Sequence, residues 1–244
     1  MPKTARINKA DKVQEEQPPL LPADKPNSRL TLLLKEYLQD DEIESIWNAY
    51  RLSKKAHEGQ KRSSGEDYIT HPVSVACIAA KFHLDAASIQ AALLHDVVED
   101  TSITVEEIEK NFNPQVAQLV GGLSKLDKIN FDDATHAQAE NFRKMLLAMS
   151  QDVRVILVKL SDRLHNIQTL NHLKPSKRIR IAQDTDYIYS PIANRLGLNS
   201  LYQELEDLAF RHIHPLRYKT INTVSYTHLR AHETSLHLVC RLLL

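Results

Sequence analysis

Apolar residues recur along this chain at the spacing of α-helical turns, and this periodicity constrains the fold more than any other feature. Residues at positions i, i+3, i+4 and i+7 line one face of a helix. Two such stripes are Ile43, Ile46, Trp47 and Tyr50, and Phe142, Met145, Leu146 and Met149. Only 5 of the 244 residues are glycine, and a low glycine content favours helices. We therefore predict an all-α fold, an irregular helical bundle.

The scarcity of glycine also excludes two classes of nucleotide-binding protein. The chain contains neither G-x-G-x-x-G nor G-x-x-x-x-G-K-[ST]. Rossmann and P-loop sites depend on these sequences, because their backbone N–H groups hold the phosphates. Neither kind of site is expected here.

Several segments predict where helices begin and end. Residues 153–160 (VRVILVKL) could alternate as a strand, but a lone strand among helices has nothing to pair with, so we predict a helix. Pro191 should kink or divide the periodic stretch 176–196. Gly121–Gly122 indicates a helix break with no phosphate cradle. Further boundary signals are the capping box of Thr104 and Glu107, Asn113 before Pro114, and Gly197 as a stop.

Charge and cysteine content point to the cell interior. The 31 basic residues balance the 31 acidic ones, so no electrostatic coat for nucleic acid or anionic lipid is expected. Cys77 and Cys240 cannot build a disulfide framework and lack C-x-x-C spacing for zinc. No apolar run is long enough for a membrane span, and no secretory signal is visible. We predict a cytoplasmic protein.

Two histidines and two aspartates stand in apolar surroundings, where a charge needs a partner. They are His71, the adjacent pair His95–Asp96, and Asp162. On a buried helix the Asp96 carboxylate must be paired, protonated or bound to a metal. Any one of these residues alone is more simply a satisfied core ion pair. Together, two imidazoles and two carboxylates form a mixed N/O set suited to a divalent ion that keeps open positions for water.

Two further acids follow one helical turn later. Glu99 stands four residues after His95, and Asp100 stands four after Asp96. On one helix these pairs share a face, which predicts that both acids orient and deprotonate water beside the metal. A solvated helix end is the alternative, and the spacing leaves both open.

Polar residues near the last aspartate predict a substrate-facing stripe. Asp162, Asn166 and Thr169 fall at i, i+4 and i+7 on an otherwise apolar helix. Asn166 and Thr169 could bind a substrate by hydrogen bonds or cap neighbouring loops. Arg62 lies nine residues before His71 in an expected loop, where its guanidinium could clamp a phosphate or stack on a base. A solvated surface charge is the alternative. Histidines without ligand spacing, which we interpret as structural, are His57, His83, His136, His172, His212 and His214.

At these positions the chain resembles a known family. The residues His71, His95–Asp96 and Asp162 are similar to the H…HD…D signature of the HD metal-dependent phosphohydrolases. Longer strings resemble the hydrolase domain of the RelA/SpoT family, whose members make and degrade the alarmone (p)ppGpp. The strings are 56–72 (AHEGQKRSSGEDYITHP), 93–101 (LLHDVVEDT), 138–149 (QAENFRKMLLAM) and 154–170 (RVILVKLSDRLHNIQTL).

The resemblance implies an all-helical HD domain that binds one manganese ion (Mn²⁺) and hydrolyses the 3′-diphosphate of (p)ppGpp to GDP or GTP and pyrophosphate. The positions that match the metal ligands are His71, His95, Asp96 and Asp162. The pair that activates water in the family matches Glu99 and Asp100. The nucleotide contacts match Arg62, Ser64, Asn166 and Thr169. One departure is Ser63, where many relatives carry a second basic residue, so we expect base or phosphate binding to be weaker or arranged differently.

Composition and the same resemblance together divide the chain into three parts. Residues 1–29 hold five of the ten prolines and no aromatic residue, a composition typical of a disordered tail. Residues 30–220 match the hydrolase domain, and we expect the chain to stop before the family's synthetase domain. Residues 221–244 resemble no part of the family and are similar to translated sequencing-adapter read-through, so we expect them to be non-native. Two alternatives stay open: hydrolysis of another 3′-phosphorylated nucleotide, and a catalytically silent nucleotide-binding module. The oligomeric state is left open.

Overall fold

The computed structural model of the chain describes residues 28–127 and 152–224. Regular structure in these two ranges is helical, apart from one isolated antiparallel bridge between Lys61 and Asp67. This confirms the predicted all-α class. The predicted stripe from Phe142 to Met149 lies outside the described residues, as do almost all of the N-terminal tail and most of the C-terminal tail.

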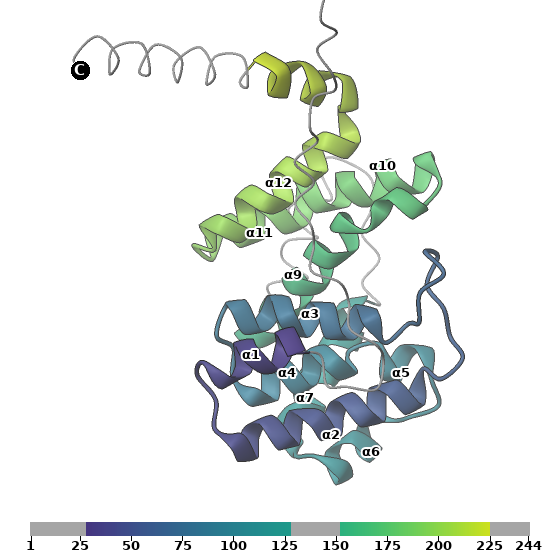
Figure 1. The fold of residues 1–244 in the computed structure, drawn as a ribbon, viewed down its shortest axis with the longest axis vertical. Coiled ribbons are helices and arrows are strands. Elements are labelled where there is room, and N and C mark those ends of the chain that lie inside the picture. Colours follow the sequence, from purple (N-terminus) through teal and green to yellow (C-terminus); the bar gives the residue numbers. More distant parts are fainter. Residues whose placement is uncertain (1–27, 128–151, 225–244) are drawn as a thin grey trace, which may run out of the picture.

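The first described range forms one body of packed helices (Figure 1). Helices α3 and α4 lie at its centre, with α2 packed against α4, α1 against α3, and α7 against α4 and α6. The helices of this body are α1 (Ser28–Lys35), α2 (Asp40–Ala56), α3 (Thr70–Lys81), α4 (Ala86–Leu94), α5 (Val97–Asp100), α6 (Val105–Asn111) and α7 (Pro114–Asp127).

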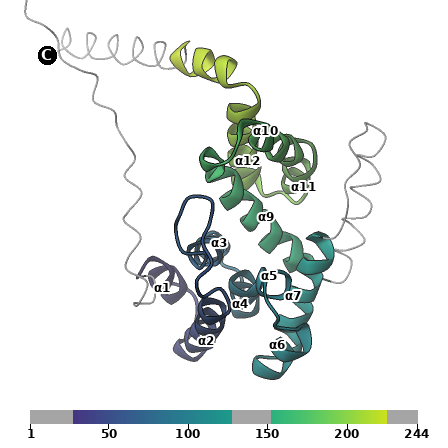
Figure 2. The same cartoon turned by 90° about the vertical axis from the view of Figure 1, so that its right-hand side faces the viewer.

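Helix α9 (Val153–Gln168) joins this body to a second group of helices (Figure 2). It packs against α3, α4 and α7 at one end and against α12 at the other. The guanidinium of Arg163 on α9 lies 4.1 Å from the ring centre of Tyr189 in the second group. The second group comprises the 3₁₀ turn η1 (Leu170–His172), α10 (Pro175–Asp184), the π-helical turn η2 (Thr185–Tyr189), α11 (Ser190–Arg195), α12 (Asn199–Ile213) and a helical segment over 215–224.

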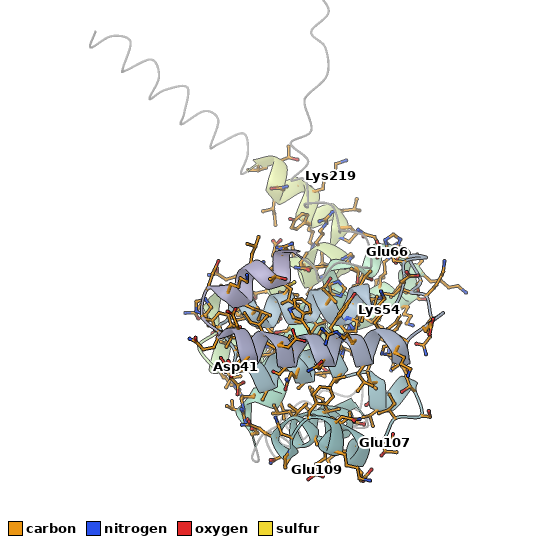
Figure 3. The ribbon with its side chains drawn as sticks, turned by 60° about the horizontal axis from the view of Figure 1, so that its bottom comes forward. Asp41, Lys54, Glu66, Glu107, Glu109 and Lys219 are labelled. Atoms are coloured by element: carbon orange, nitrogen blue, oxygen red, sulfur yellow. The ribbon has the colours of Figure 1, made fainter. Side chains whose placement is uncertain are left out.

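The apolar stripe of α2 is buried as its periodicity predicts. Ile43, Ile46 and Trp47 are buried, and Tyr50 is half-buried against the same core. The opposite face carries charge, since Asp41, Glu44 and Lys55 are exposed, and Asp41 is labelled at the surface in Figure 3. Sequence spacing alone thus determined which face of α2 meets the core.

The segment 153–160 is helical, which confirms the prediction against a strand. The carboxylate of Asp152 accepts a hydrogen bond from the backbone N–H of Arg154 and so caps the first turn of α9. Ile156, Leu160 and Ile167 are fully buried on the face toward the core. Apart from the exposed Val153, the β-branched residues of α9 therefore serve packing between helices.

The predicted helix break at Gly121–Gly122 is wrong, because both glycines lie inside α7. A Cβ atom on Gly122 would come within 2.9 Å of the Val155 side chain of α9, whereas one on Gly121 would meet Val105 at an ordinary 3.7 Å. Gly122 therefore permits close approach of α7 and α9 and does not end a helix.

The other predicted boundaries are confirmed. The 176–196 stretch is divided by the π-helical turn η2, after which α11 begins with Pro191 in its first turn. Thr104 and Glu107 form the capping box of α6. Gly197, with φ of +75°, follows the last residues of α11. In the part of the chain that the structure describes, no helix combines the length and apolar composition needed to cross a bilayer.

Candidate metal centre and substrate site

Three places in the fold bring the predicted ligands together. His71 lies in the first turn of α3, His95 and Asp96 form the turn between α4 and α5, and Asp162 lies on α9. The Nε2 atom of His71 is 3.2 Å from Asp162 Oδ1 and 3.5 Å from Asp96 Oδ2. The Nε2 atom of His95 is 3.1 Å from Asp96 Oδ1 and 3.7 Å from Asp162 Oδ1. Ligand atoms of His71, His95 and Asp162 all lie within 4.8 Å of one another.

The geometry at His95 fits a bound cation. Its Nδ1 lies 2.9 Å from the carbonyl oxygen of Ala92 and must donate to it, which leaves Nε2 facing the two carboxylates. That Nε2 atom is buried and has no hydrogen-bond partner. A lone pair that faces carboxylate oxygens is repelled unless a proton or a metal ion lies between them, so the donor set suits a divalent metal that takes the place of the proton.

Each aspartate is also held by neighbouring donors. The hydroxyl of Tyr68 donates to Asp96 Oδ2 at 2.7 Å. On Asp162, the Lys159 ammonium donates to Oδ2 at 3.0 Å and the Asn166 amide donates to Oδ1 at 2.7 Å. Contacts of this kind orient metal ligands in other proteins.

The charges in the site move its pKa values as a cation site requires. Burial opposes protonation of His95, but Asp96 and Asp162 more than offset it and raise the pKa of His95 to about 9. Burial also opposes the charge on Asp162, yet Lys159 and the two histidines hold its pKa well below the usual value. Burial dominates at His71 and lowers its pKa. The Asp162 carboxylate therefore lies beside two imidazoles, and these groups together attract a positive charge into the site.

The two predicted catalytic acids lie on a single exposed turn. Glu99 and Asp100 are both exposed on α5, and the chain does not continue as one helix from α4, which ends at Leu94. The i+4 relation still holds for Asp96 and Asp100, because the Asp100 N–H donates to the Asp96 carbonyl at 2.9 Å. Burial first, then the nearby carboxylates of Asp96 and Asp100, raise the pKa of the Tyr68 hydroxyl. Asp100 thus lies beside Asp96, one of the predicted ligands.

The loop between α2 and α3 brings Arg62 to residues of α9 that adjoin the same cluster. The N–H of Arg62 donates to the Glu66 carbonyl at 2.9 Å, and Gly65 closes the turn with φ of +88°. The guanidinium of Arg62 donates to Asn166 Oδ1 at 3.1 Å and lies 3.2 Å from His165 Nδ1. The structure therefore joins Arg62 and Asn166, which lie 104 residues apart.

Two predicted substrate contacts are less closely joined to the cluster. The hydroxyl of Ser64 donates to Glu66 Oε2 at 3.3 Å within its own loop. The hydroxyl of Thr169 donates to the carbonyl of His165 at 3.0 Å, which is the capping alternative for this residue. Its oxygen lone pairs remain available to a ligand donor.

Three residues at the site were not predicted: Tyr68, Lys159 and His165. Lys159 and His165 lie three residues before and after Asp162, so helical spacing would place them next to it. A lysine inside an apolar run is also a signal of a buried ion pair. Nothing in the spacing of Tyr68, which precedes α3 in the loop, indicates its contact with Asp96.

Comparison with known proteins agrees with this arrangement. Residues 49–199 match the family model described as HD domain. The chain belongs to the HD domain family. The matched range contains all four proposed metal ligands and the Arg62 loop, and the resemblance predicted from the motifs is confirmed.

The curated relatives are named for reactions of guanine nucleotides. The chain is 55% identical over 195 residues to the bifunctional (p)ppGpp synthase/hydrolase SpoT of Escherichia coli K12. It is 53% identical over 190 residues to a guanosine-3′,5′-bis(diphosphate) 3′-pyrophosphohydrolase of Vibrio cholerae. It is 50% identical over 185 residues to a GTP pyrophosphokinase of Myxococcus xanthus. These matches cover 80%, 78% and 75% of this chain, and 28%, 27% and 24% of the relatives. The chain thus spans about a quarter of the length of the curated relatives it matches.

A solved structure shares the fold. It is described as a metazoan ortholog of SpoT that hydrolyses ppGpp and plays a role in starvation responses. The TM-score is 0.52 at 26% sequence identity, over 74% of this chain and 99% of that one. The HD bundle predicted for this chain is therefore a known three-dimensional arrangement.

Proposed function

We propose that this chain is a metal-dependent (p)ppGpp 3′-pyrophosphohydrolase. It would hydrolyse the 3′-diphosphate of guanosine 3′,5′-bis(diphosphate), or of its 5′-triphosphate form, to GDP or GTP and pyrophosphate. The support from the relatives is their printed activity and the 53–55% identity over this region. We place the reaction in the cytoplasm, where guanine nucleotides are made and used.

One observation carries the proposal. The buried cluster of His71, His95 and Asp162 lies directly beside a guanidinium–amide pair, Arg62 and Asn166, since Asn166 contacts both Asp162 and Arg62. A cation site next to a guanidinium suits a phosphorylated substrate, because each offsets negative charge on phosphoryl oxygens.

The proposed metal ligands are His71, His95, Asp96 and Asp162, and the proposed ion is Mn²⁺. A divalent ion at this site would acidify water and neutralise developing charge on the phosphoryl group. Mixed imidazole and carboxylate ligands suit several divalent ions, Mn²⁺ among them. The preference for Mn²⁺ rests on resemblance to the RelA/SpoT family.

The chain's own side chains would bind the nucleotide and move the proton. Arg62 would exchange its contacts with His165 and Asn166 for the substrate, and Ser64, Asn166 and Thr169 would add hydrogen bonds. Either Glu99 or Asp100, both exposed on α5, would accept the proton of the attacking water at a carboxylate oxygen. Phosphoryl transfer needs mainly positioning and charge neutralisation, so this set is sufficient.

The test is pyrophosphate release from ppGpp by the purified 244-residue chain, with Mn²⁺ and with a chelator. We expect release that depends on Mn²⁺ and that is lost in Asp96→Ala. Folded, metal-loaded protein that releases no pyrophosphate would contradict the proposed substrate. Assaying other 3′-phosphorylated nucleotides in parallel then separates a different substrate from a silent module.

A second experiment tests the two acids. The double substitution of Glu99→Gln and Asp100→Asn should abolish turnover and leave Mn²⁺ affinity nearly unchanged, because neither acid is among the proposed ligands. The single substitutions show which carboxylate accepts the proton. Turnover retained in the double variant would remove both acids from the mechanism.

A further inference from the structure

His165 occupies a position between the proposed substrate contact and the proposed metal site. It lies on α9, three residues after Asp162. Its Nδ1 atom is 3.2 Å from the guanidinium of Arg62 and 2.8 Å from Nδ1 of His71. One ring nitrogen thus contacts both a proposed nucleotide-binding residue and a proposed metal ligand.

The hydrogen-bond roles in this trio follow from the chemistry of the groups. A guanidinium has only N–H donors, so the His165 Nδ1 that faces Arg62 must accept and carries no proton. The same nitrogen cannot donate to His71, so Nδ1 of His71 must donate to it. In the neutral ring of His71 the lone pair then lies on Nε2.

That assignment determines whether His71 can bind a cation. Its Nε2 points at Asp162 Oδ1, 3.2 Å away, and at Asp96 Oδ2, 3.5 Å away. A proton on Nε2 would occupy the coordination position, whereas a lone pair there is ready for a metal. Metal-bound histidines commonly donate their second ring N–H to a fixed acceptor, and here the acceptor is another histidine.

We propose that His165 is a positioning residue that fixes the tautomer of His71, so that the Nε2 lone pair of His71 faces the metal site. This inference rests on the proposed metal site but not on the identity of the substrate. His95 needs no such partner, because the backbone carbonyl of Ala92 already fixes its Nδ1–H.

The first experiment reads the tautomers directly in the unmodified chain. Long-range ¹H–¹⁵N correlation spectra of histidine-labelled protein loaded with the diamagnetic ion Zn²⁺ distinguish protonated from unprotonated ring nitrogens. We expect His71 to carry its proton on Nδ1 and His165 to carry its proton on Nε2, with His95 Nδ1 protonated as the internal reference. A neutral His165 ring with its proton on Nδ1 would overturn the proposal, and this result does not depend on any variant folding.

The second experiment measures Mn²⁺ affinity from the free-ion electron paramagnetic resonance signal. His165→Leu removes the acceptor, and we expect Mn²⁺ affinity to fall about 10- to 100-fold, the usual effect of losing such a contact. His165→Asn keeps an acceptor oxygen near the same place and should recover most of the affinity. His172→Leu, an exposed histidine on η1, is the matched control and should bind like the unmodified chain.

The outcomes separate positioning from simple packing. Equal losses in His165→Leu and His165→Asn would mean that the ring fills space and sets no tautomer. Unchanged affinity in folded His165→Leu would overturn the proposal as well. Neither readout uses nucleotide, so failure of the ppGpp assay would leave this result standing, and the reverse also holds.

Discussion

At the scale of single residues, the two proposed carboxylate ligands are each restricted by a neighbour. Asp96 accepts from Tyr68 on Oδ2, and Asp162 accepts from Lys159 on Oδ2. The other oxygens, Oδ1 in both cases, are the ones nearest His95 Nε2, and Asp162 Oδ1 also accepts from the Asn166 amide. The neighbours thus fix the orientation of each carboxylate at the proposed metal site.

The contact from Tyr68 makes a testable contribution. Tyr68→Phe deletes the donor to Asp96 without changing the ring, so we expect Mn²⁺ affinity to fall by roughly tenfold or more. Isothermal titration with Mn²⁺ measures it. Tyr37→Phe is the matched control, because it removes a hydroxyl contact to the Leu84 carbonyl and leaves the proposed ligands untouched. Equal affinity in both variants would show that Tyr68 does not orient the ligand.

The raised pKa of His95 predicts how metal binding depends on pH. The pKa of His95 is about 9 in the metal-free site, so below that pH the metal must displace a proton. Apparent Mn²⁺ affinity should therefore rise with pH up to about 9, by roughly tenfold per pH unit. Titrations in buffers of different ionisation enthalpy count the protons released. No proton release at neutral pH would contradict this, and His95→Ala should abolish the dependence.

How far the sequence predicts the site differs from residue to residue. The four proposed ligands stood out because charge among apolar residues is costly and needs an explanation. His165 was accessible in principle, since it lies at i+3 from Asp162 on the same helix. Tyr68 was not, because its contact with Asp96 joins a loop to the turn after α4, and no local periodicity encodes such a pairing.

At the scale of elements, α7 and α9 pack so closely at Gly122 that adding a single methyl group there should lower the stability of the fold. Gly122→Ala would place a Cβ atom 2.9 Å from buried Val155. Overpacking of this kind costs about 1–3 kcal/mol and exceeds the helix-propensity gain of about 1 kcal/mol. We expect the melting temperature to fall by several degrees.

Gly121 provides the control, because its substitution should change the melting temperature in the opposite direction. Gly121→Ala meets Val105 at 3.7 Å, an ordinary contact, so only the propensity gain of about 1 kcal/mol applies. Its melting temperature should rise by about 2–4 °C. Thermal unfolding followed by circular dichroism measures both variants, and shifts of the same sign would refute the close-approach explanation.

Elements were predictable where the signal is local. The stripe of α2, the capping box of α6 and the helix at 153–160 depend on neighbouring residues and were predicted correctly. Gly121–Gly122 was misjudged because the reason for glycine there is a residue on another helix. The break between α4 and α5 was also missed, since Asp96 and Asp100 keep their i+4 relation within the turn that follows it.

At the scale of the whole molecule, α9 is the element on which both groups of helices depend. It packs against α3, α4 and α7, and it also contacts α12 and η2. The side-chain amide of Gln168 on α9 donates a hydrogen bond to Glu204 of α12 at 2.7 Å. The proposed metal ligands come from α3, the α4–α5 turn and α9, so a bound ion would tie the first body to the helix that carries the second.

This arrangement predicts that metal stabilises the molecule as one unit. At a Mn²⁺ concentration about 100 times the dissociation constant, binding to the native state adds about 2.7 kcal/mol. For a chain of this size the melting temperature should rise by about 5–10 °C. Hydrogen exchange should slow in α3, α4 and α9 together, because opening any one of them releases the ion. In Asp96→Asn, which keeps the shape of the ligand but removes its charge, both effects should be greatly reduced. A similar rise in that variant, or protection confined to one helix, would place the ion elsewhere.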